Sequence, residues 1–155
     1  MREFGVRSLA SDSLQGGAPV LLLESADGDI LPIWIGPAEA YAIATQLAGI
    51  QPPRPMTHDL MVTLISSLGG TLKRVVITGL RDGTYYALLH IEINDSLVVI
   101  DARPSDSVAL ALRVNCPILV EDDIPTFRFD DATEEAKDLK ARLKEFRAED
   151  FRGEV

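Results

Sequence analysis

The sequence predicts an α+β fold with a mixed, largely antiparallel sheet and packed helices, and three observations indicate it. Strand-length apolar runs are joined by tight-turn residues, most clearly at Asp27-Gly28-Asp29 and at Asp82-Gly83. Helical patterns are interleaved with these strands, and several strands follow one another through hairpins, which is typical of an α+β domain. A strand-to-helix corner also occurs twice with similar residues, so an internal pseudo-repeat is expected.

Several segments have the apolar, turn-bounded pattern of a strand. They are residues 4–10, 20–26, 30–35, 72–80, 84–93, 97–102 and 117–121. Prolines and glycines mark the helices between them. Pro37 suits the first position of a helix that ends at Gly49, and the second corner begins a helix that runs through Arg113.

Two more helices are predicted from their start signals. Thr57 is a good N-cap for a helix over residues 58–68. The apolar face expected for that helix consists of Leu60, Met61, Leu64, Ile65 and Leu68. Residues 132–150 predict an exposed, amphipathic C-terminal helix capped by Thr133, with a basic row that is expected to be solvated. The chain therefore divides into a domain over residues 1–128 and a helical tail over 129–155.

Composition and charge limit the possible functions. The chain has 155 residues, of which 46% are hydrophobic and 25% charged, and its net charge is −9. This negative charge argues against a protein that binds nucleic acid through its overall electrostatic field. It does not exclude an enzyme that contacts nucleic acid at one local site. No membrane-spanning run or signal-peptide pattern is found, so a cytoplasmic protein is expected. The single cysteine, Cys116, is expected to be a buried, inert thiol.

The two predicted corners, "IGPAEAYAIATQL" and "ARPSDSVALALRV", align without gaps. The aligned pairs are Pro37 with Pro104, Glu39 with Asp106, Ala42 with Ala109 and Ala44 with Ala111. An acid at the third helical position can accept from unpaired N–H groups and lies at the positive end of the helix dipole. Glu39 and Asp106 are thus explained equally well by helix capping and by chemistry.

Arg103 and Asp101 distinguish the second corner, because the first has Gly36 in place of the arginine. An arginine before the proline does not improve the cap, but beside a helix N-terminus it could bind an anion. The alternative is a salt bridge from Arg103 to Asp101 or to an acid on a neighbouring strand. The sequence leaves both interpretations open.

Other polar residues are weaker candidates for a functional site. His58 lies in the first turn of its predicted helix, where a neutral imidazole could act as a base or metal ligand, although a surface helix start explains it too. His90 fits an ordinary sheet residue or one that lines a cleft. Arg81 flanks a hairpin tip. The acidic run over residues 121–123 could help to hold a cation, or could simply be solvated.

Four blocks, in this order, carry a family resemblance: "LPIWIGPAEAYAIA", "PRPMTHDLM", "RVVITGLRDGTYYALL" and "VIDARPSDSVALALR". Together they resemble the bifunctional nuclease (DNase/RNase) domain family, from about the first strand to "PILVEDDI". The resemblance implies a compact, self-associating α+β domain that hydrolyses phosphodiester bonds of DNA and RNA. The resemblance provides no agreed set of catalytic residues that could be transferred to this sequence.

The site hypothesis therefore rests on chemistry. Phosphodiester cleavage needs an activated water, neutralisation of phosphate charge and usually a divalent metal held by carboxylates. Glu39, Asp101 and Asp106 could supply catalytic carboxylates and hold magnesium or manganese if the two corners face each other. Arg103 and Arg81 could bind the phosphate, and His58 could act as base.

Two classes of function follow. One is a nuclease, expected to be metal-assisted, that acts on DNA and RNA as a homodimer or larger homo-oligomer. The other is a non-catalytic ligand-binding or protein-interaction domain with a regulatory role.

Overall fold

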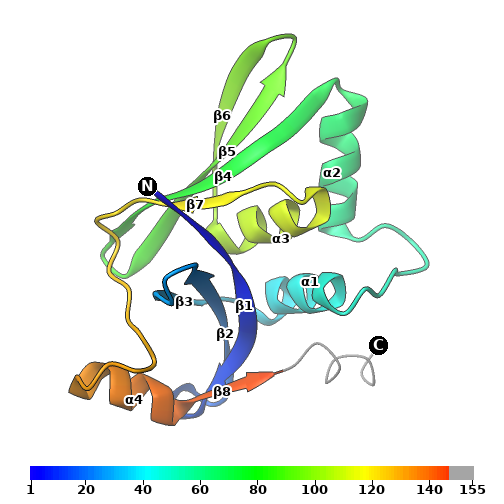
Figure 1. The fold of residues 1–155 in the computed structure, drawn as a ribbon. Coiled ribbons are helices and arrows are strands. Elements are labelled where there is room, and N and C mark those ends of the chain that lie inside the picture. Colours follow the sequence, from blue (N-terminus) through cyan, green and yellow to red (C-terminus); the bar gives the residue numbers. More distant parts are fainter. Residues whose placement is uncertain (147–155) are drawn as a thin grey trace.

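The structure is a computed structural model that describes residues 1–146. It confirms the predicted α+β class, with four α-helices and one eight-stranded sheet in the described part (Figure 1). The strands are β1 (Arg2–Asp12), β2 (Ala18–Ser25), β3 (Ile30–Trp34), β4 (Gly70–Arg81), β5 (Thr84–Ile93), β6 (Ser96–Ala102), β7 (Ile118–Val120) and β8 (Leu143–Phe146). The helices are α1 (Pro37–Leu47), α2 (Thr57–Ser67), α3 (Pro104–Val114) and α4 (Glu134–Arg142), with a short 3-10 turn at Ser13–Gln15.

The sheet is mixed and largely antiparallel, as the hairpin signals predict. Its order is β3-β2-β1-β7-β4-β5-β6, and β8 pairs with β1 off this path. Only β4 and β7 pair in parallel among the described strands. Two hairpin meanders, β1–β2–β3 and β4–β5–β6, thus flank the short central strand β7. Each meander ends at an edge strand, and each edge strand leads into a helix.

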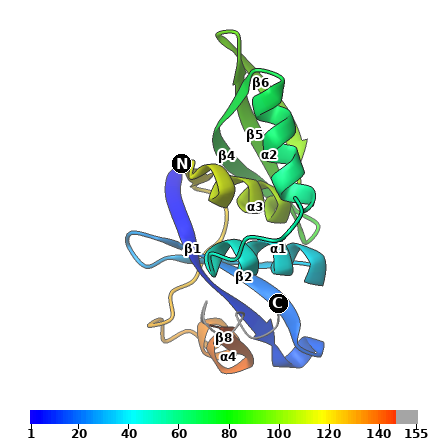
Figure 2. The same cartoon turned by 90° about the vertical axis from the view of Figure 1, so that its right-hand side faces the viewer.

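The helices α1 and α3 follow the two edge strands and lie side by side on one face of the sheet (Figures 1 and 2). The Arg113 guanidinium on α3 donates to the Ala42 carbonyl on α1 at 3.1 Å, which shows their closeness. The main core forms between these helices and the sheet, with Leu21, Ile43 and Leu110 fully buried. The hydrophobic layer therefore fixes how the two helix starts are placed.

The two corners begin their helices as predicted. Pro37 and Pro104 each occupy the first helical turn. The repeated alanines share a role, because small side chains allow the two helices to pack closely against the sheet. Ala42, Ala44, Ala109 and Ala111 are all buried.

The helix α2 differs from the prediction in two ways. It begins at Thr57 itself, because the Asp59 carboxylate accepts a hydrogen bond from the Met56 N–H at 3.0 Å. Its buried side is also rotated from the expected face: His58 is buried, and Met61, Val62 and Ile65 pack on the core. The remaining residues of the predicted face are exposed, namely Leu60, Leu64 and Leu68. Periodicity identified the helix but not which side the core would cover.

The C-terminal helix is present but shorter than predicted. It is capped by the Thr133 hydroxyl, which accepts from the Ala136 N–H at 3.2 Å. It ends at Arg142, because the next four residues pair antiparallel with β1 as strand β8. Residues 147–150 of the predicted helix lie outside the described residues. Tertiary strand pairing overrides the helical pattern here.

None of the helices within residues 1–146 is long and apolar enough to cross a lipid bilayer. Cys116 is partly buried, and this burial raises the pKa of its thiol, which fits the expected inert role.

Candidate functional site

Three helix starts meet at one small cavity of about 210 Å³. Its lining includes Glu39 from α1, His58 from α2, Asp106 from α3 and Arg103, which immediately precedes α3. These four residues are called the Arg103 cluster below. Since the N-terminus of a helix carries a partial positive charge and unpaired N–H groups, their convergence favours anionic groups at this place.

Arg103 joins the two repeated corners. Its Nη2 donates to Glu39 Oε1 at 2.7 Å, and its Nε donates to Asp106 Oδ2 at 2.8 Å. The aligned acids therefore face each other across one guanidinium, as the hypothesis of facing corners requires. The salt-bridge interpretation of Arg103 also holds in part, but its partners are these helix-start acids and not Asp101.

His58 forms the second link of the cluster. Its Nε2 lies 2.8 Å from Asp106 Oδ1, and its side chain is only 8% exposed. His58 is therefore not an exposed residue at the surface of a helix start. The rotated face of α2 turns His58 inward, where a carboxylate oxygen fixes the orientation of the ring.

The charges within the cluster support one another. Burial raises the pKa of Asp106, but hydrogen bonds from Arg103 and His58 outweigh it and leave the pKa lowered. A backbone N–H at the start of α1 and the Arg103 guanidinium lower the pKa of Glu39. The hydrogen bonds to Asp106 and Glu39 in turn raise the pKa of Arg103. Both acids are thus ionised at neutral pH, and the arginine is charged.

The structure does not bring Asp101 to the other two carboxylates. Asp101 is exposed on β6 and makes no ion pair with the described residues. Side chains alternate along a strand, and its neighbours Ile100 and Ala102 stand opposite the buried Leu89 and Ala87 of β5. Asp101 therefore points to the face opposite the helices. Within residues 1–146, no group of three or more His, Cys, Asp or Glu side chains could hold a metal ion.

Arg81 lies at the end of β4, beside the β4–β5 hairpin tip. Its guanidinium lies 4.8 Å from the centroid of the Tyr86 ring, in a cation–π contact. It makes no ion pair with the described residues, so its charge is available at the surface.

The remaining polar candidates, His90 and the acidic run over residues 121–123, lie outside the Arg103 cluster. His90 is on β5 between its partners Arg74 and Val99, and its Nδ1 is buried without a hydrogen-bond partner in the described part of the chain. Burial and the Arg74 charge lower its pKa. In the acidic run, Asp122 pairs with the N-terminal amine at 2.6 Å.

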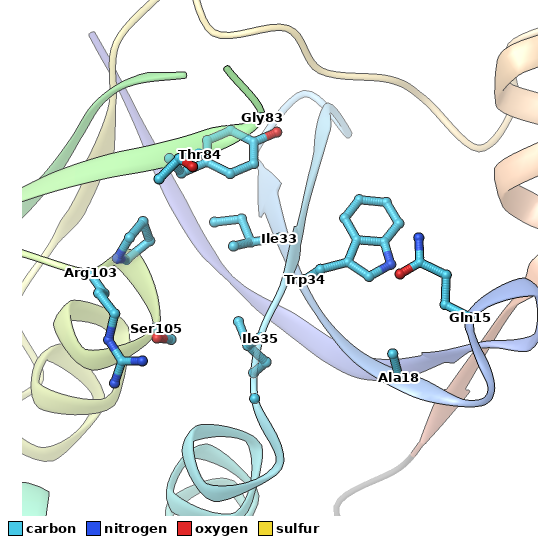
Figure 3. A pocket seen from close by; sticks show the side chains of 12 residues that line it. Gln15, Ala18, Ile33, Trp34, Ile35, Gly83, Thr84, Arg103 and Ser105 are labelled. Atoms are coloured by element: carbon cyan, nitrogen blue, oxygen red, sulfur yellow. The ribbon is translucent and has the colours of Figure 1, made fainter. Parts of the chain in front are cut away.

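Sequence reasoning missed a second, larger cavity that adjoins the cluster through Arg103. It holds about 500 Å³, and Trp34, Tyr85 and Ser105 contribute to its lining (Figure 3). A sequence signal was present, since Trp34 is the only tryptophan and stands just before the first corner. Its role in a cavity depends on packing between distant segments, which no local pattern reveals.

A sequence model of the bifunctional nuclease domain matches residues 20–127, well over half of the chain. The chain belongs to this family. All four residues of the Arg103 cluster lie within the matched range.

The relatives differ in similarity and in length. An uncharacterized protein of Mycobacterium tuberculosis is 56% identical over 107 residues, which is 68% of this chain and 63% of the relative. Bifunctional nuclease 1 of Oryza sativa subsp. japonica is 28% identical over 112 residues, 70% of this chain and 34% of the relative. Bifunctional nuclease 2 of Arabidopsis thaliana is 27% identical over 106 residues, 66% of this chain and 32% of the relative. The chain thus matches less than two thirds of the mycobacterial protein and about a third of the plant proteins.

Proposed function

We propose that the chain is a cytoplasmic nuclease that hydrolyses phosphodiester bonds of DNA and RNA at the Arg103 cluster. Membership of the bifunctional nuclease domain family and the names of its plant relatives support the reaction class. The observation that carries the proposal is the buried His58–Asp106 hydrogen bond beside an exposed arginine.

Arg103 is the group that would bind the phosphate. Its side chain is 65% exposed although two carboxylates hold it, and its Nη1 makes no hydrogen bond with residues 1–146. A guanidinium held in this way can present its free donor to a phosphate oxygen without losing its orientation. Glu39 contributes by fixing the guanidinium between the two helix starts.

His58 is the group that would move protons. Because Nε2 is bound to Asp106, Nδ1 is the nitrogen left to exchange a proton with water in the small cavity. Asp106 acts as a positioning residue, since its carboxylate fixes the orientation of the ring. Phosphodiester hydrolysis needs such proton transfer to and from the attacking water and the leaving oxygen.

The predicted magnesium or manganese does not fit the donors as they stand. Glu39 and Asp106 already bind a guanidinium, Asp101 faces away, and the described residues form no three-ligand group. No step of the proposed reaction is therefore assigned to a metal. Metal assistance remains a proposal that a chelator tests directly.

The deciding experiment measures cleavage of end-labelled DNA and RNA strands by the purified protein, with and without chelator. It is run beside Arg103→Gln and the matched control Arg54→Gln, which removes the same charge from an exposed arginine with no ion pair in the described chain. We expect Arg103→Gln to lower the cleavage rate about 100-fold, because it removes a preorganised donor to the phosphate, and Arg54→Gln to leave it unchanged. Equal activity of both variants would refute the assignment, and loss of activity with chelator would establish the metal.

A second observation supports the expected self-association of the chain. The edge strand β6 exposes four successive apolar side chains, Leu97 to Ile100, by 38–50%. An open, apolar edge is rare without a covering partner. A second copy suits it, because an antiparallel edge can pair with itself about a two-fold axis, and residues 96–100 are uncharged in an otherwise acidic chain.

Light scattering after size-exclusion chromatography tests this pairing. We expect a dimer that Val99→Lys converts to a monomer, while Leu14→Lys, an equally polar change at an exposed leucine away from β6, leaves it intact. A Val99→Lys variant with unchanged mass would argue against the β6 interface.

A further inference from the structure

The 500 Å³ cavity beside the Arg103 cluster has the size and lining of a small-molecule site. Four segments meet there: the start of α3, the end of β3, the tip of the β4–β5 hairpin and the turn after β1 (Figure 3). Arg103 lines both this cavity and the smaller one with His58. A phosphate held by Arg103 would therefore have the larger cavity directly next to it.

Aromatic and aliphatic side chains make up the walls. Trp34 and Tyr85 contribute rings, and Ile33 and Ile35 contribute aliphatic surface. The Trp34 side chain is held in place, because its Nε1 donates to the buried Asp12 carboxylate at 3.0 Å. Trp34 nevertheless remains 37% exposed, although the Arg142 guanidinium lies 6.0 Å from the centroid of its ring, so part of a preformed aromatic surface is open to a ligand.

Ser105 places a hydroxyl group in the lining of the cavity. Ser105 is only 6% exposed and lines the cavity, yet its hydroxyl makes no hydrogen bond with the described residues. It belongs to the first turn of α3, an eleven-residue helix whose N-terminus also favours anions. Because the hydroxyl oxygen can still be reached from the cavity, it can form a hydrogen bond with a ligand that binds there.

We propose that this cavity binds the base of an unpaired nucleotide whose phosphate lies at Arg103. The inference rests on the proposed function and deepens it, because it specifies single-stranded DNA or RNA as the substrate class. The rings of Trp34 and Tyr85 offer stacking surfaces, and Ser105 offers a hydrogen bond to the nucleotide. Stacking tolerates all four bases and does not distinguish DNA from RNA.

The charge of the chain supports recognition by stacking. A net charge of −9 disfavours the long track of phosphate contacts that gives duplex binders their affinity. A neutral base in an aromatic cavity avoids this repulsion and needs only one local phosphate contact. A base within a duplex would first have to leave its stack, which costs free energy that an unpaired base does not have to supply. Single strands should therefore be cleaved faster than duplexes.

Because Trp34 is the only tryptophan and lines this cavity, its fluorescence can report binding there without a background from other tryptophans. The wild-type protein is titrated with adenosine 5′-monophosphate and, separately, with ribose 5-phosphate, which has the phosphate and sugar but no base. We expect saturable quenching with the nucleotide and at least tenfold weaker binding of the sugar phosphate, because one stacked base is lost. An equal response to both compounds, or no response to either, would overturn the proposal.

Two variants locate the base. Tyr85→Ala and Ser105→Ala should each weaken nucleotide binding, the first by about tenfold through loss of stacking. Tyr41→Ala is the matched control, since Tyr41 is an exposed tyrosine of α1 outside the cavity lining. Unchanged binding by both cavity variants, with folding verified by circular dichroism, would contradict the assignment even if the wild type binds the nucleotide.

The failure of this inference is distinguishable from failure of the nuclease proposal. Base-dependent quenching without cleavage of any strand would support the base site and refute the nuclease. Cleavage that is equal for single strands and duplexes, with no base-dependent quenching, would support the nuclease and refute the base site.

Discussion

Two clusters in this chain each join an arginine to carboxylate groups, but the two arginines differ in exposure, 19% for Arg142 and 65% for Arg103. In the first, which we call the Asp12 cluster, Arg142 donates twice to Asp12, at 3.0 and 2.6 Å, and Trp34 donates a third hydrogen bond at 3.0 Å. The Leu14 N–H adds a fourth at 3.0 Å, and Asp12 is 0% exposed. In the Arg103 cluster, the arginine is largely exposed and keeps a free donor.

The difference indicates what each cluster can do. Every oxygen of Asp12 is occupied, so no ligand can bind there without breaking protein contacts. Its function is to attach α4 and β8 to the end of β1 and to fix Trp34. The Arg103 cluster is held by its carboxylates but not saturated, and a cavity opens beside it. Saturated ion pairs are structural, whereas a restrained arginine with a free donor can bind a ligand.

The largest expected effect comes from His58→Gln. The glutamine amide can still donate to Asp106, but it cannot transfer a proton, so we expect the cleavage rate to fall about 100- to 10,000-fold. Thermal unfolding should remain close to that of the wild type. His90→Gln is the control, because it removes the other histidine, which lies outside the cluster. Retained activity in His58→Gln would place the chemistry elsewhere.

In contrast to His58→Gln, Asp12→Asn should cause a large loss of thermal stability. It removes the negative charge and replaces one of the two acceptor oxygens by an amide donor, so one pair of buried N–H donors loses its acceptor. We therefore expect a lower melting temperature and altered Trp34 fluorescence. Asp138→Asn is the matched control, since its exposed carboxylate binds the same guanidinium at 3.2 Å. A surface ion pair contributes little, and this variant should melt near the wild type. Equal melting of both variants would contradict the contrast between the two clusters.

Acid should abolish the contribution of Asp12 to stability. The Arg142 hydrogen bonds, which outweigh the opposing effect of burial, together with those from Trp34 and Leu14, lower the pKa of Asp12 from 3.8 to about 2. Because the folded pKa is the lower one, this stabilisation is complete above the unfolded pKa and is lost as pH falls through the folded pKa. Melting of the wild type and Asp12→Asn, measured between about pH 5 and pH 2, should therefore converge at the acid end. A constant gap would show that Asp12 does not titrate as described.

The smallest effect is expected from Thr133→Ala. It removes the side-chain cap of α4 and should cost about 1 kcal/mol of stability, measured by urea unfolding. Thr133→Ser keeps the hydroxyl and serves as the control. Equal loss in both variants would mean that the cap does not explain the stability of this helix.

Local patterns were sufficient for much of the fold. The hairpin dipeptides and the strand runs predict the two meanders, and the prolines locate the starts of α1 and α3. The predictions that changed depend on what a segment packs against. Leu143–Phe146 has a helical pattern but pairs with β1, and Leu64 has the expected periodicity but faces outward because α2 is rotated on the core.

In the candidate site, too, some features follow from local sequence and others depend on tertiary packing. Local sequence patterns place an acid at the third position of α1 and of α3, and Arg103 directly before the second of these helices. The tertiary structure alone decided that Arg103 meets Glu39 across 64 residues and that His58 meets Asp106 across 48. It also decided that Asp101, two residues before Arg103, faces away. Helix-start chemistry is local and visible in sequence, but which starts converge is fixed by burial of the alanine and leucine faces beneath them.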